Sequence, residues 1–221
     1  MSLRDLSQIA RINRIPKFSP DGKLYSTFSN LRREIRKFVR YKDELLIEVS
    51  DIHSAHFTML PLLFEKCKIA IPPHELLKFK EITQKKDLYS EVVQGTMIRR
   101  DDIKPVFQSF FSIKNEKQYL FSCNTAEYQH RQIICNYFNK NFPVLYSSMI
   151  DFHHTQKNTI KSVANVVESE IMNPICDRIQ KEGLHPFRLH DAIYMTEKES
   201  NQSKVNINQM VYDTINHKNT N

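Results

Sequence analysis

Glycine is scarce in this chain, with only Gly22, Gly95 and Gly183 among 221 residues. Three isolated glycines cannot build G-x-G-x-x-G or G-x-x-x-x-G-K-[ST], the loops whose backbone N–H groups close on phosphates. The sequence therefore excludes P-loop and Rossmann-type nucleotide binding. No apolar run approaches the ~18 residues of a membrane-spanning helix, and the first ten residues lack the apolar core of a secretory signal. We expect a cytoplasmic protein without a membrane partner.

Metal-binding spacings of cysteine and histidine are also missing. The four cysteines form no C-x-x-C pair and match no zinc pattern. We expect them to be reduced and mostly buried, with a disulfide as the less favoured alternative. His153 and His154 are adjacent, so their side chains point in different directions. We interpret these two and His185 as surface residues.

The charge balance is basic, and the length suits one domain with a small appendage. Lys and Arg total 32 against 25 Asp and Glu, which gives a net charge of +7. A basic chain favours an anionic partner, with nucleic acid as the first candidate. At 221 residues the chain is long enough to bury a sizeable core.

The first forty residues combine a basic arm with a predicted helix. Residues 1–27 are irregular and punctuated by proline, which is typical of an arm. From Ser29 or Asn30, apolar residues recur at helical spacing through Val39. The opposite face is either a solvated surface or a phosphate-contacting stripe. That face carries Arg32, Arg33, Arg36, Lys37 and Arg40.

Two short apolar runs predict strands that each lead into an aspartate. Leu45–Val49 reads as a buried strand that ends in Ser50-Asp51, and residues 187–194 as two strands around a tight turn that holds Asp191. The polar segment 197–221 is expected to be mobile. The strands among many helices predict an α+β fold. Helices are expected from 57 to 60 (perturbed by Pro61), from 88 to 94, from 103 to about 113, from 125 toward 142, and from 160 to 179 (stopped by Gly183), with a break at Pro72-Pro73.

Asp51 and Asp191 are the first candidates for a functional site. They stand 140 residues apart, yet their apolar strands are suited to lie side by side in one sheet. Two carboxylates at adjacent strand ends can hold Mg²⁺, which prefers oxygen ligands and keeps positions for phosphate. Two such ions ~3.5–4 Å apart stabilise both oxygens of a phosphoryl displacement. Between the aspartates, Arg100-x-x-x-Lys104 puts two cations on one helix face, a spacing suited to a triphosphate.

The order of these motifs resembles the palm and fingers of family A DNA polymerases and the related phage-type single-subunit RNA polymerases. The similarity covers roughly residues 24–196, within a predicted domain from 28 to 196. Its segments are Asp51-Ile52-His53-Ser54-Ala55-His56, Asp87-Leu88-Tyr89, Arg100-Asp101-Asp102-Ile103-Lys104, Val166–Glu170 on the long helix, and Leu189-His190-Asp191-Ala192-Ile193-Tyr194.

The resemblance implies a small antiparallel palm-like sheet with a helical fingers-like insertion. Asp51 and Asp191 would bind two Mg²⁺ ions, and Arg100 and Lys104 would contact the triphosphate. His190 would lie near the primer end. His56 stands where the family carries a glutamate that senses the sugar. Pro105 disfavours helix at the preceding residue, so we expect the fingers helix to begin later than the family pattern places it.

The function that this resemblance implies is template-directed nucleotide transfer, in a minimal polymerase-like protein of a phage or mobile element. Its partners would be nucleoside triphosphates and primer–template or single-stranded nucleic acid. Whether a separate chain supplies a thumb domain is left open by the sequence. The alternative is a polymerase-like accessory replication protein that binds nucleic acid without synthesis. A third interpretation is a basic α+β protein whose aspartates only serve turns.

Overall fold

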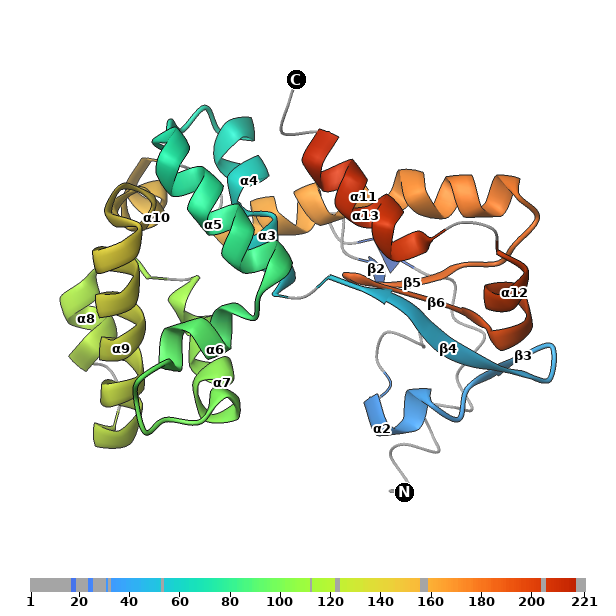
Figure 1. Cartoon of the computed structure of the whole chain (residues 1–221), viewed down its shortest axis with the longest axis horizontal. Coiled ribbons are helices and arrows are strands. Elements are labelled where there is room, and N and C mark those ends of the chain that lie inside the picture. Colours follow the sequence, from blue (N-terminus) through green and yellow to red (C-terminus); the bar gives the residue numbers. More distant parts are fainter. Residues whose placement is uncertain are drawn as a thin grey trace. The chain divides into compact units, whose positions relative to one another are not determined.

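The computed structural model describes residues 17–18, 24–25, 31, 33–52, 54–111, 113–121, 124–155, 159–203 and 206–217. The chain divides into two compact units (Figure 1). We call Met1–Ile52 together with Asn165–Asn221 the sheet unit, and His53–Ala164 the helical unit. The helical unit is therefore an insertion in the sequence of the sheet unit.

The sheet unit is built on four antiparallel strands in the order β3-β4-β6-β5. A small antiparallel sheet in a helix-rich chain confirms the predicted α+β class. Most of the predicted arm lies outside the described residues, apart from a separate two-stranded pairing of β1 with β2. The strands are β1 (Lys17–Phe18), β2 (Leu24–Tyr25), β3 (Arg40–Tyr41), β4 (Glu44–Asp51), β5 (Phe187–Leu189) and β6 (Ala192–Thr196).

Helices α11 (Ile160–Lys181) and α13 (Ile207–His217) belong mainly to the sheet unit. The long predicted helix is confirmed as α11, and Gly183, with a φ of +80°, follows its end. This left-handed conformation is one that glycine adopts without steric cost. The unit also contains α2 (Arg33–Arg36) and α12 (Glu197–Gln202). The α11 stripe is buried at Ile160, Val167, Ile171, Ile175 and Ile179.

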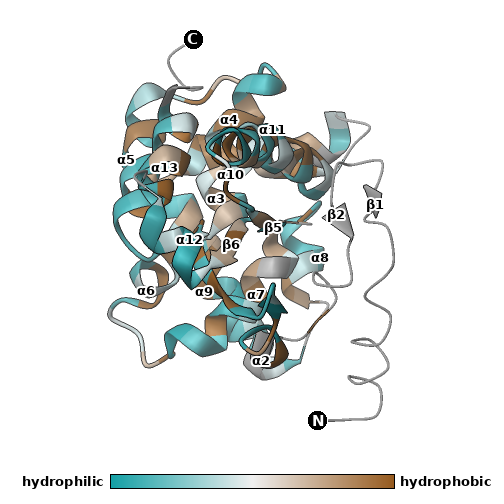
Figure 2. Ribbon diagram, turned by 90° about the vertical axis from the view of Figure 1, so that its right-hand side faces the viewer, coloured by the Kyte–Doolittle hydropathy of each residue, from teal (hydrophilic) through white to brown (hydrophobic). Residues whose placement is uncertain are grey.

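The helical unit packs around phenylalanines. Phe138 is fully buried, and its ring contacts those of Phe57, Phe110 and Phe142. Several helices show one hydrophobic and one hydrophilic side, which is what burial of a single face requires (Figure 2). The helices are α3 (Ala55–Thr58), α4 (Leu60–Lys66), α5 (Pro73–Lys85), α6 (Leu88–Val93), α7 (Arg100–Phe110), α8 (Glu116–Phe121), α9 (Thr125–Asn141) and α10 (Pro143–Thr155).

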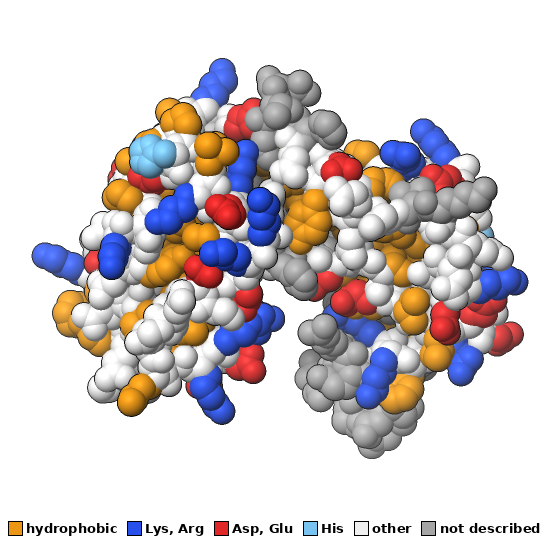
Figure 3. Space-filling view, in the orientation of Figure 1, with side chains coloured by type: hydrophobic (Ala, Val, Ile, Leu, Met, Phe, Trp, Pro, Cys, Tyr) orange, Lys and Arg blue, Asp and Glu red, His pale blue; other side chains and the backbone are white. Residues whose placement is uncertain are grey.

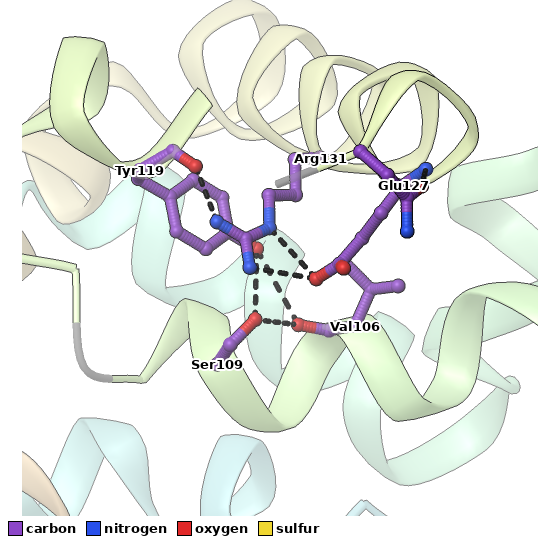
Figure 4. Close-up of polar contacts among 6 residues, drawn as sticks. Val106, Ser109, Tyr119, Glu127 and Arg131 are labelled. Atoms are coloured by element: carbon purple, nitrogen blue, oxygen red, sulfur yellow. Dashed lines mark hydrogen bonds and ion pairs between the residues drawn. The ribbon is translucent and has the colours of Figure 1, made fainter. Parts of the chain in front are cut away.

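A buried arginine ties three of these helices together. Arg131 on α9 is 9% exposed and donates to the Glu127 carboxylate at 2.6 Å and to the Tyr119 carbonyl (Figure 4). Its guanidinium lies 4.4 Å from the centre of the Tyr119 ring. The Tyr119 hydroxyl in turn donates to the Val106 carbonyl of α7 at 3.4 Å. Because the buried guanidinium has a carboxylate and a carbonyl as hydrogen-bond acceptors, its positive charge is compensated.

The helix predicted from residue 29 to 40 is wrong at its C-terminal end. The helix α2 ends at Arg36, and Arg40 lies in β3. The chain reverses at Lys42 and Asp43, with φ values of 50° and 64°, which make a two-residue hairpin turn between β3 and β4. Strand pairing overrides helical spacing here, so Arg36 and Arg40 do not share one helix face.

The tail predicted to be mobile carries two helices in its described residues. The Thr196 hydroxyl accepts from the Glu199 N–H and caps α12. In α13, Ile207, Val211 and Ile215 are all at most 5% exposed. These residues recur at intervals of four, so a single narrow apolar stripe holds the helix although the segment is polar overall.

Two prolines begin or continue helices that we expected them to interrupt. Pro73 opens α5, where its missing N–H has no intrahelical partner to lose. Pro105 lies inside α7, which begins at Arg100 rather than at Ile103 or later. Residue 105 lies in the second turn of α7, so its ring removes one hydrogen bond near the helix start and leaves the rest of the helix intact.

Cysteine burial follows the expectation where it is described. Cys135 and Cys176 are buried, and Cys67 is half-buried, all as free thiols; Cys123 lies outside the described residues. Burial raises the pKa of Cys135 and of Cys176 to about 11, so these two thiols stay protonated at neutral pH. Within the described part of the chain, no helix combines the length and apolar character needed to cross a bilayer.

Candidate active site

The sheet brings the two predicted aspartates to the same end of neighbouring strands. Asp51 is the last residue of β4 and pairs with Ala192, the first residue of β6. Asp191 immediately precedes β6, and its carbonyl accepts from the Ile52 N–H at 3.1 Å. The expected adjacency of the two strands is therefore confirmed, and both aspartates lie at the same end of the sheet.

A bulge in β4 sets this register. Glu48 pairs with Tyr194, but Ser50 pairs with Ile193, so one extra residue is accommodated at Val49. Without it, Asp51 would pair with Asp191 rather than with Ala192. Bulges often occur beside functional sites because they redirect the side chains that follow. The period-two pattern of the sequence does not reveal such an insertion.

The turn that carries Asp191 has an unusual backbone. Leu189 pairs with Ala192, which leaves His190 and Asp191 as a two-residue turn. His190 has a φ of +53°, in the left-handed region. For a residue with a Cβ atom this conformation costs roughly 1–2 kcal/mol. Strain of this kind persists only where surrounding contacts hold it, and it clusters at functional sites.

The carboxylates around Asp191 interact electrostatically. Burial raises the pKa of Asp191 to about 7, with further contributions from the negative charges of Asp51, Glu168 and Glu48. Asp51 and Glu48 lie on β4, whereas Glu168 extends from α11. Concentrated negative charge of this kind favours a cation, because a bound cation would relieve the repulsion.

An arginine that the sequence analysis did not single out lies beside this group. Arg188 of β5 pairs with Glu168 of α11 at 3.0 Å, and their side chains are 6% and 7% exposed. The available signal was a lone arginine between Phe187 and Leu189, inside an apolar strand. A charge is rarely buried without a partner, so that position alone indicated a buried acid nearby.

Arg100 and Lys104 meet over one aromatic ring in the helical unit. The Arg100 guanidinium lies 5.4 Å, and the Lys104 ammonium 5.8 Å, from the centre of the Tyr89 ring. Arg100 also donates to Asp87 at 2.5 Å and to Asp101 at 3.1 Å. The expected convergence of the two cations is present, and an acidic residue already pairs with the first of them.

The remaining predicted residues have local partners or lie outside the description. The His56 ring packs 5.4 Å from the Phe111 ring. Arg36 donates to the Leu31 carbonyl at 2.9 Å, and Arg40 donates to the Asp43 carbonyl at 2.7 Å. Arg32 falls outside the described residues. The two described arginines therefore lie in different elements, Arg36 in α2 and Arg40 in β3, each with a local backbone partner.

Replacing Asp87 by asparagine should destabilise the protein in a pH-dependent way. Burial raises the pKa of Asp87, but hydrogen bonds from Arg100 and Ser90 outweigh it and leave the pKa below its usual value. Such a carboxylate stabilises the fold above the unfolded-state pKa of about 3.9, and the stabilisation is lost as pH falls through the lower folded-state pKa. We expect a loss of about 0.2–1 kcal/mol at pH 7, because the pair is partly exposed. Urea unfolding from pH 7 down to about 3 should show the difference from wild type shrinking below pH ~4.

The matched control for that measurement is Asp151→Asn, which removes an exposed carboxylate from α10. Its stability should follow the wild type at each pH. A constant deficit of Asp87→Asn down to low pH would show that the Asp87 charge is not responsible.

No protein-family model, curated protein or solved structure matches this chain. The argument for a function therefore depends on the site itself. Among the described residues, no three His, Cys, Asp or Glu side chains form a ready metal cage. Mg²⁺ commonly takes only one or two carboxylates and completes its shell with water and phosphate. The oxygen donors of Asp51 and Asp191 fit that chemistry.

Proposed function

We propose that this protein is a template-directed nucleotidyltransferase that uses two divalent cations. The observation that carries the proposal is the pair Asp51 and Asp191, distant in sequence but at the same end of two adjacent strands, with mutual repulsion that a cation would relieve. The order of motifs along the chain supports a polymerase-like reaction over other phosphoryl transfers.

The residues of the chain would divide the task between metal and substrate binding. Asp51 and Asp191 would hold the cations, which when bound stabilise charge on the attacking and leaving oxygens. Arg100 and Lys104 would bind the triphosphate, since a guanidinium and an ammonium both suit phosphate oxygens. For this, Arg100 exchanges its bond to Asp87 for one to a phosphate oxygen. His190, next to Asp191, would lie near the primer end.

A second candidate is a nucleic-acid-binding replication protein without synthesis. The pairing of Arg100 with both Asp87 and Asp101 favours it, because these acids already neutralise the charge that a triphosphate requires. Primer extension with Mg²⁺ separates the two functions. Nucleotide incorporation by the wild type supports the nucleotidyltransferase. A folded wild type that binds primer–template but extends it with neither ribonucleotides nor deoxyribonucleotides supports the second candidate.

Divalent metal should raise the thermal stability of the wild type but not of Asp191→Asn. Without metal, the ionised Asp191 repels its neighbours, so the asparagine variant should melt at a higher temperature than the wild type in EDTA at pH 8. Added Mg²⁺ should then stabilise only the wild type, because a ligand stabilises the state that binds it. Equal Mg²⁺ shifts in both proteins would place the metal elsewhere. Differential scanning fluorimetry with and without Mg²⁺ measures both effects.

Nucleic-acid binding should weaken steeply with salt. The chain carries a net charge of +7, and Lys and Arg side chains are spread over the visible face of the helical unit with Asp and Glu between them (Figure 3). Contacts to phosphates release counterions, so affinity falls as salt rises. Fluorescence anisotropy with a labelled primer–template should show a loss of about tenfold or more between 50 and 200 mM salt. Equal binding at both concentrations would contradict a phosphate-dominated interface.

A further inference from the structure

We propose that Arg188 is the positioning residue of this site, which fixes the His190–Asp191 turn to α11 and so holds the Asp191 carboxylate beside Asp51. The inference rests on the proposed function, because it assigns Arg188 a role in cation binding by the two aspartates.

Arg188 bonds to the turn through one edge of its guanidinium. Its Nε donates to the carbonyl of His190 at 3.1 Å. That carbonyl belongs to the residue with a φ of +53°, immediately before Asp191. The bond therefore holds the strained peptide that determines where the Asp191 side chain begins.

The other edge of the guanidinium bonds to three side chains along α11. One terminal nitrogen donates to Asn173 at 2.5 Å, and the other to Glu168 at 3.0 Å and to Ser169 at 3.1 Å. Glu168 and Ser169 are buried, as is Arg188 itself at 8% exposure. A planar, rigid fork of five N–H donors can serve a helix and a turn on opposite edges, whereas lysine offers three donors from a single point. The helix, which extends over 22 residues, thus acts as a fixed support for the turn.

This arrangement explains why a charge is buried in an otherwise apolar strand. A buried ion pair is weak evidence for stability, because desolvation offsets most of its attraction. A turn anchored by directional bonds, by contrast, keeps a metal ligand in place before the metal binds. Positive charge on Arg188 also compensates Glu168, so that Glu168 adds less repulsion to the carboxylates.

The test compares Mn²⁺ binding by the wild type and by Arg188→Lys in the full-length protein. Lysine keeps a positive charge opposite Glu168 but lacks the Nε–H that bonds to the His190 carbonyl. We expect the Kd for Mn²⁺, measured by electron paramagnetic resonance of the free ion, to rise 10–100-fold, as for other residues that orient metal ligands. High Mn²⁺ should then restore nucleotide incorporation in Arg188→Lys but not in Asp191→Asn.

The matched control is Arg131→Lys in the helical unit. Arg131 is equally buried, pairs with a glutamate and donates to a backbone carbonyl, but it belongs to the α7–α8–α9 cluster. The Arg131→Lys variant should lower the melting temperature about as much as Arg188→Lys does, and it should leave the Mn²⁺ affinity unchanged. If Arg188→Lys does not fold, Asn173→Ala removes one bond of the same guanidinium and should weaken Mn²⁺ binding in the same direction.

The outcomes separate this inference from the proposed function. Unchanged Mn²⁺ affinity in a folded Arg188→Lys, or an equal loss in Arg131→Lys, would overturn the positioning role alone. A wild type that binds no Mn²⁺ would overturn the proposed function, and this inference with it.

Discussion

Asparagine at position 191 is expected to lower the rate of nucleotide incorporation by on the order of 10³-fold or more. The substitution keeps the shape of the side chain but removes the charge that would hold the cation. A metal ligand of this kind contributes several kcal/mol of transition-state stabilisation, and each 1.36 kcal/mol corresponds to a tenfold change in rate. Primer extension under single-turnover conditions measures the loss. Binding of primer–template should stay nearly unchanged, because phosphate contacts come from Lys and Arg.

Asp177→Asn provides the control for Asp191→Asn. Asp177 is exposed on α11 in the same unit, so its replacement changes the net charge equally without touching the candidate site. It should extend primers at the wild-type rate. Persistent activity in Asp191→Asn would mean that the metal site has been assigned to the wrong residues.

Phe138→Ala should remove about 3–5 kcal/mol of folding free energy, the cost typical of a large buried aromatic. The ring is fully buried and lies 4.8 Å from Phe110 and 6.0 Å from Phe142, between centroids. Its removal leaves a cavity that neighbouring rings cannot fill without leaving their own contacts. Domains are typically stable by only about 5–15 kcal/mol. The urea concentration at the midpoint of unfolding should therefore be much lower for Phe138→Ala than for the wild type.

Leu77→Ala is the comparison for this loss of stability. Leu77 is 68% exposed on α5, so truncation should change stability by no more than about 0.5 kcal/mol. A Phe138→Ala variant within about 1 kcal/mol of wild type would show that the rings do not form a tightly packed core.

Features with a strong local pattern could be predicted from the sequence. The apolar stripe of α11 and the alternation around the His190–Asp191 turn indicated a long helix and a hairpin, and both are present. Adjacency of β4 and β6 was expected because both strands are apolar and each adjoins an aspartate. The convergence of Arg100 with Lys104 followed from helical spacing, although the pairing of Arg100 with Asp87 did not.

Features set by tertiary contacts could not be predicted from the sequence. The residues before β4 satisfy helical spacing, but pairing across the Lys42–Asp43 turn makes Arg40 part of a strand. The helix α13 has a narrow apolar stripe that a polar composition hides, and only burial stabilises it. The position of Arg188 in an apolar strand indicated a buried acid, but not which one, because its partners Glu168 and Asn173 stand about 15 to 20 residues earlier in the chain.

Insertion of the helical unit between β4 and β6 has a consequence for the folding of the chain during its synthesis on the ribosome. Closing a loop of about 140 residues costs roughly (3/2)RT ln n, or about 4 kcal/mol beyond a constant. The helical unit is rich in contacts between helices near in sequence, which form quickly. It can therefore fold while β4 still has an unpaired edge. The two aspartates come together only after residues 187–196 have emerged, so the proposed metal site cannot assemble before that hairpin has been synthesised.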